Sequence, residues 1–221
     1  MKTAKLLPLL LLTAMLPGLA AAKYLSGTNA AKWKVGEGPP RPWQYNAPEA
    51  GTSVRIVQHE GTAWIELRDD SASLSASLRQ EFSPLKSARL SLRIALPEDH
   101  RGEFGIYVGT GNASSTDERI VDLKTNSRGV LRMGSGGERV DSSLVLPAGT
   151  TTHVFVEFRA KGSNLLLRVG RIGVDGRDEL LGEHTFPERA DLVTRLRITT
   201  DNAATGSRVL VSNLLLQSVS G

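Results

Sequence analysis

Three carboxylates with catalytic potential stand close together in the sequence: Glu66, Asp69 and Asp70. Two carboxylates about 5 Å apart in a cleft can hydrolyse a glycosidic bond, one as the acid and one as the nucleophile. Arg68 separates Glu66 from the aspartates, however, and Asp69-Asp70 has the composition of a turn that follows a strand. Because catalytic carboxylates need matched surroundings, we interpret the set as a solvated strand end and predict no catalytic residues in it.

Metal-binding motifs are not indicated. There are four histidines, His59, His100, His153 and His184. No two of them stand at i, i+2 or i+4, the spacing with which one element presents two ligands to zinc. Calcium would take loop oxygens such as those of Asp117-Glu118 or Asp201-Asn202, although turn formation explains these residues equally well. We predict no metal site and no cofactor, and leave a structural calcium ion open.

A serine nucleophile and a phosphate loop are not indicated either. The sequence Gly134-Ser135-Gly136-Gly137 misses the G-x-S-x-G pattern of hydrolases, because Met133 stands where the first glycine belongs. No glycine-rich loop is followed by Lys and Ser or Thr. These absences favour binding over bond cleavage.

Aromatic and arginine side chains are the candidates for contact with a ligand. Amphipathic rings stack against the C–H faces of sugars, and outward arginines attract acidic groups through their forked donors. The candidate binding residues are Trp33, Trp43, Tyr45, Trp64, Arg93, Tyr107 and Arg159. Other interpretations stay open: Trp33 and Trp43 can cover an open end of the domain, and outward arginines can simply keep a sheet face hydrated.

The first 22 residues have the pattern of a secretory signal peptide. Lys2 and Lys5 precede the apolar run Leu6–Leu12, and small residues close the segment at Ala20-Ala21-Ala22. The run is too short and too interrupted for a membrane anchor. We predict cleavage after Ala22, export to the periplasm or the exterior, and no membrane span after cleavage.

Net charge and cysteine content limit the kinds of partner and covalent modification that the chain can have. Loss of Lys2 and Lys5 leaves 25 basic against 23 acidic residues, so the net charge falls from +4 to +2. A nucleic-acid partner would require a clustered basic face, and we predict none. The chain has no cysteine, which excludes disulfides, a thiolate metal site and a lipidated cysteine.

Two regions follow the signal peptide. Residues 23–50 are rich in proline, glycine and tryptophan, which predicts an irregular arm with one edge strand at Lys32–Val35. Residues 51–221 show strand periodicity and are predicted to form one domain. In Thr151–Arg159, alternate residues are apolar, and the break at Lys161-Gly162-Ser163 predicts a hairpin with the next strand.

About a dozen such strands and no helix are expected. Their spacing of about 8–12 residues predicts an all-β sandwich of two facing antiparallel sheets. The clearest strand segments are Ala63–Ser71, Ala76–Phe82, Arg89–Ile94, Phe104–Gly109, His153–Phe158 and Ser207–Leu216. With the aromatic arm before them, these segments resemble the concanavalin A-like, laminin-G-like jelly-roll domains of exported bacterial proteins. The resemblance covers about Ser53–Val219 and rests on strand order and apolar spacing.

The resemblance implies two curved sheets, a glycan site on the concave face or the rim loops, and sometimes a structural calcium ion. It therefore favours an exported, non-catalytic jelly-roll module that binds a polysaccharide or another cell-envelope glycan. One alternative is a polysaccharide lyase or glycoside hydrolase with dispersed catalytic residues; His59, Tyr107 and Arg93 are the nominees for a lyase. The other alternative is a structural or partner-binding subunit without a ligand.

Overall fold

Fourteen β-strands and no helix make up the part of the chain that the computed structural model describes, residues 33–48, 50–200 and 206–219. The strands are β1 (Gln44–Asn46), β2 (Thr52–His59), β3 (Thr62–Asp69), β4 (Ser77–Leu85), β5 (Ala88–Leu96), β6 (Phe104–Gly109), β7 (Arg119–Thr125), β8 (Val130–Ser135), β9 (Glu138–Val145), β10 (Thr150–Lys161), β11 (Asn164–Ile172), β12 (Asp178–Phe186), β13 (Val193–Thr200) and β14 (Ser207–Ser218). The predicted signal peptide lies outside the described residues. No helix of the described part is long and apolar enough to cross a membrane.

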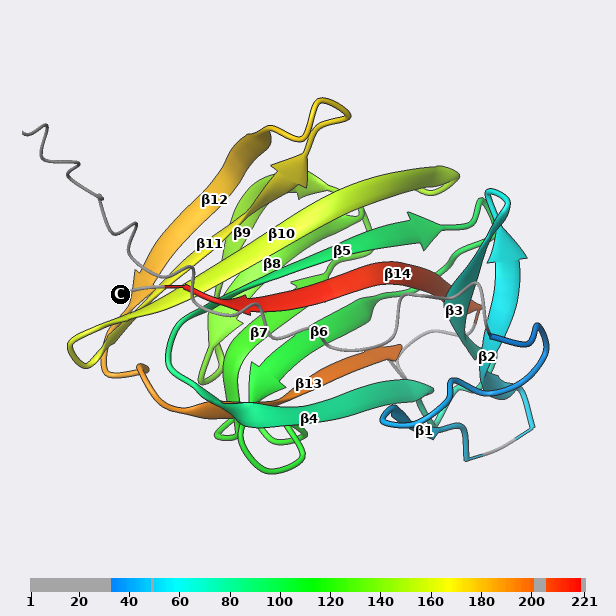
Figure 1. The fold of residues 1–221 in the computed structure, drawn as a ribbon, viewed down its shortest axis with the longest axis horizontal. Helices are drawn as coiled ribbons and strands as arrows, with labels where there is room; N and C mark the ends of the chain where they lie inside the picture. The colour runs from blue at the N-terminus through cyan, green and yellow to red at the C-terminus, as the bar shows by residue number, and fades with distance from the viewer. Residues whose placement is uncertain (1–32, 49, 201–205, 220–221) are drawn as a thin grey trace, which may run out of the picture.

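The strands form two seven-stranded sheets (Figure 1). Sheet A has the order β1-β4-β13-β6-β7-β8-β9, and sheet B has the order β12-β11-β10-β5-β14-β3-β2. Strands β12, β11, β10, β5 and β14 run side by side in Figure 1, with β4, β13 and β6 in the other layer. All paired strands are antiparallel. The prediction of an all-β, two-sheet jelly-roll sandwich is confirmed.

One continuous apolar core lies between the sheets. Along β5, Leu90 and Leu92 are buried, whereas Arg89, Ser91 and Arg93 lie on the opposite, outer face. This alternation follows from the period of two in a strand, which sends successive side chains to opposite faces. The hairpin of β10 and β11 also forms as predicted, with Lys161 opposite Asn164 at its tip.

The arm differs in detail from its prediction. The prediction of an edge strand at Lys32–Val35 is wrong for the described residues 33–35. The chain turns at Val35-Gly36, with a positive φ of 88° at Gly36. The arm instead contributes β1, which pairs with β4 at the edge of sheet A. Glu37 and Gly36 also bond to Ile56 of β2, so the arm is attached to both sheets.

Candidate functional site

The predicted aromatic binding residues lie apart from one another. Trp43 is buried in the core, Trp33 packs against that core from the arm, and Tyr45 lies half-exposed on β1. Trp64 is fully buried on the outer side of sheet B, where its indole N–H donates to Thr62 Oγ1 at 2.9 Å. The buried rings of Trp43 and Trp64 offer no open face to a sugar, so these residues do not build a shared stacking platform.

Arg93 and Arg159 belong to a different arrangement, a layer of ion pairs on the outer face of sheet B. Seven arginines of this face each lie within 2.9 Å of a carboxylate oxygen: Arg55, Arg68, Arg89, Arg93, Arg159, Arg168 and Arg208. Arg93 pairs with Glu60 and covers the ring of Trp64, with its guanidinium carbon 5.0 Å from the ring centroid. The cations of this face are therefore already matched by acids within the protein.

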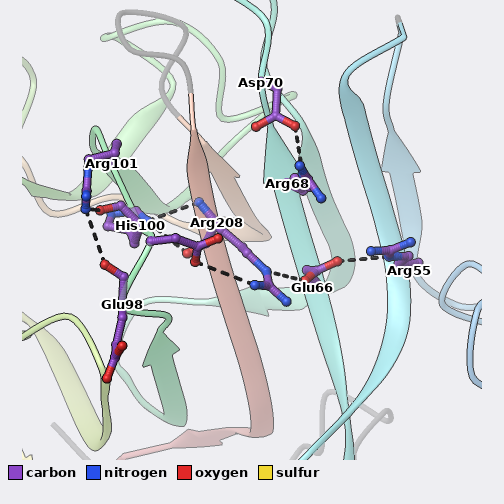
Figure 2. A network of polar contacts seen from close by, with 9 residues as sticks. Arg55, Glu66, Arg68, Asp70, Glu98, His100, Arg101 and Arg208 are labelled. Carbon is purple, nitrogen blue, oxygen red and sulfur yellow. Dashed lines mark hydrogen bonds and ion pairs between the residues drawn. The ribbon is translucent and has the colours of Figure 1, made fainter.

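Glu66 belongs to the same layer, as Figure 2 shows. Its side chain is fully buried, and its two oxygens accept hydrogen bonds from Arg55 Nε at 2.9 Å and Arg208 Nε at 2.6 Å. Asp69 is also fully buried but accepts from Thr200 Oγ1 at 2.9 Å, and Asp70 pairs with Arg68. The three carboxylates thus have separate partners and share no cleft.

The outer face of sheet A carries a row of aligned residues that crosses six strands, and five of the six residues are polar. Cross-strand pairing places Arg79 of β4 opposite Arg197 of β13, Arg197 opposite Tyr107 of β6, and Tyr107 opposite Asp122 of β7. Gly134 of β8 and Arg139 of β9 continue the row. Directly opposite residues point to the same side of a sheet. The row therefore faces outward, since the flanking Leu78 and Ile198 are in the core.

A pocket of about 370 Å³ opens around the middle of this row. Four cationic side chains line it, those of Arg119, Lys124, Arg139 and Arg197. Tyr107, Thr199 and other hydroxyl residues complete its wall, and none of the described lining residues is acidic. Sites of this kind, with a few polar groups converging on a hollow of 300–1,000 Å³, are typical of ligand pockets.

Asp122 neutralises one side of the pocket. It is almost fully buried, and its Oδ2 accepts a hydrogen bond from Arg139 Nη2 at 2.7 Å. Arg119 Nη1 lies 3.8 Å from the same oxygen. One buried carboxylate thus orients two arginines at the β7 side of the pocket.

The opposite side of the pocket has no such acid. Arg79 and Arg197 are half-buried, and the Nε of each is shielded from solvent without a hydrogen-bond partner among the described residues. Burial, followed by the charge of nearby Arg119, lowers the pKa of Arg197 from its ordinary value. Like charges directly opposite on neighbouring strands are unfavourable, so this side of the pocket lacks a counter-charge.

Tyr107 lies between the two sides. A Cβ atom on Gly105 would come within 2.3 Å of the Tyr107 hydroxyl, so the phenol lies flat along β6 over that glycine. The Arg119 guanidinium carbon lies 3.9 Å from the ring centroid, and one face of the ring is therefore occupied. Burial raises the pKa of Tyr107 above its ordinary value near 10. The hydroxyl is thus protonated at neutral pH and can donate a hydrogen bond within the pocket.

Gly105→Ala is expected to displace the Tyr107 ring, because the new methyl group and the hydroxyl cannot occupy the same space. We expect a loss of about 1–3 kcal/mol in the free energy of unfolding, as for other overpacked sites, measured by denaturant titration. In a Tyr107→Ala background the same substitution should cost clearly less, since the clashing ring is gone. Equal costs in both backgrounds would contradict this placement.

The rim of the pocket includes a loop fastened by Glu118. One Glu118 carboxylate oxygen accepts hydrogen bonds from the backbone N–H of Ser114 at 2.9 Å and from the Ser114 hydroxyl at 3.1 Å. Hydrogen bonds from the backbone N–H groups of Ser114 and Ser115 lower the pKa of Glu118 from 4.5 to about 2. Arg119 fastens the same loop by donating to the Ser114 carbonyl at 2.6 Å.

Glu118 should make the loop sensitive to acid. Because its pKa is lower in the folded protein than in the unfolded chain, its contribution to stability is fully present above pH 4.5 and is lost as the pH falls towards about 2. An NMR titration of the Glu118 carboxyl should show a midpoint at about 2. In Glu118→Gln, the amide signals of Ser114 and Ser115 should lose this pH dependence. A midpoint near 4.5 would show that the loop hydrogen bonds do not form.

A second pocket, of about 460 Å³, lies between loops and is lined in part by His100, Arg101, Asn126 and Leu146. The Nδ1 atom of His100 lies 3.0 Å from the backbone N of Arg208, which fastens this loop to β14 (Figure 2). Burial lowers the pKa of His100, which keeps the imidazole neutral at pH 7. These polar groups already serve the fold, and the pocket on sheet A is the better candidate.

The described residues give no indication of a metal site. No three His, Asp or Glu side chains of that part form a group suited to a metal ion. Of the predicted binding residues, only Tyr107 lies in the sheet A pocket. The lining residues Arg119, Lys124 and Arg139 were not predicted, nor was Arg79, which is the cross-strand partner of the lining residue Arg197. Alternation places Arg79 on an outer face, but nothing in the local sequence places it opposite Arg197.

Comparison with known proteins is informative only at the level of structure. No family model matches the sequence, and no curated protein matches it. A sialidase structure matches with a TM-score of 0.60 at 18% identity; the match covers 80% of this chain but only 17% of the sialidase chain. Alginate lyase vAL-1 from Chlorella virus matches with a TM-score of 0.54 at 10% identity, covering 89% of this chain and 100% of the lyase. A legume lectin-like domain from Entamoeba histolytica matches with a TM-score of 0.52 at 13% identity, covering 81% and 91%.

These similarities show the fold, which is a concanavalin A-like jelly roll. The fold is found in both lectins and carbohydrate-active enzymes. Because one fold hosts several functions, the role of this chain has to be argued from its site.

Proposed function

We propose that this chain is a carbohydrate-binding domain whose site is the sheet A pocket around Tyr107. The observation that carries the proposal is the difference between the two outer faces. Sheet B is covered by internal ion pairs, whereas sheet A has an open pocket with cations and hydroxyl groups from several strands. The likeness of the fold to lectins supports a glycan as the ligand.

Affinity-gel electrophoresis against neutral and acidic polysaccharides tests this proposal. We expect at least one polysaccharide to retard the purified protein and Tyr107→Ala to reduce the retardation. Arg93→Ala is the control, because Arg93 lies on the outer face of sheet B. Circular dichroism of each variant separates lost binding from lost folding. Retardation that Arg93→Ala abolishes and Tyr107→Ala leaves intact would place the site on the other sheet.

A polysaccharide lyase is the second candidate, and the position of Tyr107 favours it. Elimination from a uronate needs a proton acceptor, a proton donor and a group that neutralises the carboxylate. Tyr107 offers a protonated phenol as the proton donor, and Arg119 and Arg197 next to it can neutralise the carboxylate. The described lining holds no carboxylate or imidazole, so the proton acceptor would have to come from outside this lining. Absorbance near 235 nm over a panel of polyuronates would detect the unsaturated product. A flat trace with a polyuronate that the protein binds would leave binding as the function.

Export is proposed together with glycan binding. The support is the charged and apolar pattern of residues 1–22 with its small residues at Ala20-Ala21-Ala22. N-terminal sequencing of the protein recovered outside the cytoplasm should begin at Lys23. A protein that keeps Met1 in the cytoplasmic fraction would exclude this proposal.

A further inference from the structure

We propose that the glycan is anionic and that Arg79 and Arg197 hold its charged group, a carboxylate or a sulfate ester. This inference rests on the proposed glycan-binding function and names the class of ligand. Its starting point is that the two arginines are cross-strand partners on β4 and β13. Neither has an acid partner among the described residues. This sets the pair apart, whereas the buried Nε without a hydrogen-bond partner is shared with Arg139 and Arg195, which do have acid partners.

Among the described arginines of the outer sheet faces, the lack of a counter-charge is specific to this pair. On the same face, Arg195 pairs with Glu81, Arg132 with Asp141 and Arg139 with Asp122. On sheet B, the seven outer arginines all have carboxylate partners. The protein thus balances its outer-sheet cations by local pairing, and leaves Arg79 and Arg197 unbalanced beside a pocket.

The surroundings of Arg79 and Arg197 favour the binding of an anion. Arg197 is half-buried, and burial, followed by the charges of Arg119 and Arg79, lowers its pKa. A bound anion would relieve this repulsion, and hydrogen bonds from a guanidinium to an ionised acceptor are among the strongest in proteins. The planar guanidinium fork suits carboxylates and other oxyanions.

The pocket geometry places neutral sugar atoms next to the charged group. The Arg197 side chain borders the pocket, and Tyr107 follows it on the next strand. Gly105, two residues before Tyr107, has no side chain, and the Tyr107 phenol lies over it, so the ring forms part of the pocket floor. At the far side, Asp122 already neutralises Arg139. We infer that the anionic group binds at the Arg79–Arg197 side and that hydroxyl-bearing sugar atoms lie towards Tyr107.

Isothermal titration with four glycans tests this inference: a polyuronate, a sulfated polysaccharide, and a neutral counterpart of each. The variants are Arg79→Gln and Arg197→Gln, which keep a polar side chain but remove the charge. Arg132→Gln is the matched control, because it removes one positive charge from the same face at a residue that has its own acid partner. We expect each test variant to weaken binding of the anionic glycan about tenfold or more, and the control less than about threefold.

The outcomes separate the two proposals. Equal affinity for the neutral and anionic glycans, or unchanged affinity in the Arg79→Gln/Arg197→Gln double variant, would overturn the anionic inference and leave glycan binding in place. No binding to any glycan would overturn the proposed function as well. The polyuronate and the sulfated arms identify which anion is preferred. If a variant does not fold, the preference of the unaltered protein for anionic over neutral glycans still decides the inference.

Discussion

Replacing Phe158 with alanine is expected to lower the free energy of unfolding by about 3–5 kcal/mol, the usual cost of removing a fully buried phenylalanine. Phe158 lies on the inner face of β10, opposite Ala88 of β5 and Leu167 of β11, and has no exposed surface. The neighbouring strands hold it from both sides, so the cavity cannot close by the movement of a loop. Denaturant titration should show a lower midpoint with an unchanged slope.

Phe155→Ala on the same strand is the comparison. Phe155 faces outward and is covered by Arg89, whose guanidinium carbon lies 4.3 Å from the ring centroid. An arginine at the surface can move into the space or let water enter, so we expect a smaller loss than for Phe158, since the cost depends on how far the site can collapse. A larger loss for Phe155 than for Phe158 would mean that the inner and outer faces of β10 have been exchanged.

The two faces of each strand could be predicted from the sequence because their cause is local. Alternation fixed which side of β5 and β13 is apolar, and Leu196 and Ile198 lie in the core as expected. Alternation also places the polar Gln80 of β4 inward, in line with Leu78 and Phe82, and Gln80 is buried. Residue polarity alone would have placed this glutamine on the outer face.

The candidate site could not be predicted because it depends on which strands become neighbours. Arg79 and Arg197 belong to strands far apart in the sequence, and only the order β4-β13-β6 brings them beside Tyr107. Whether each aromatic residue is exposed or buried could not be predicted for a related reason. A tryptophan in the sequence is equally compatible with a stacking surface and with a core position, and packing of the arm decides that Trp43 is buried.

The charged outer face of sheet B also has more structure than a hydrated surface. Arg55 is the cross-strand neighbour of Glu66, and Arg208 reaches the same carboxylate from β14. A fully buried carboxylate is therefore held between two arginines that remain partly in contact with solvent. Because Glu66 is fully buried and the two arginines are partly exposed, we expect removal of the arginines and removal of the Glu66 charge to change stability by different amounts.

The double variant Arg55→Ala/Arg208→Ala is expected to lose about 3–5 kcal/mol of stability, because it leaves the Glu66 carboxylate buried without a cationic partner. Glu66→Gln should lose less, about 1–2 kcal/mol, since the two guanidinium groups it frees can turn towards water and the glutamine can still accept a hydrogen bond. Denaturant titration of both variants at neutral pH shows which of them loses more stability.

The triple variant Arg55→Ala/Arg208→Ala/Glu66→Gln provides the decisive control. If the loss in the double variant comes from a stranded charge, neutralising Glu66 in that background should restore part of the stability, although Glu66→Gln alone is destabilising. This reversal of sign is the mark of coupling between contacting residues. If the triple variant is less stable than the double variant, the arginines act by packing over β2 and β14 rather than by matching the buried charge.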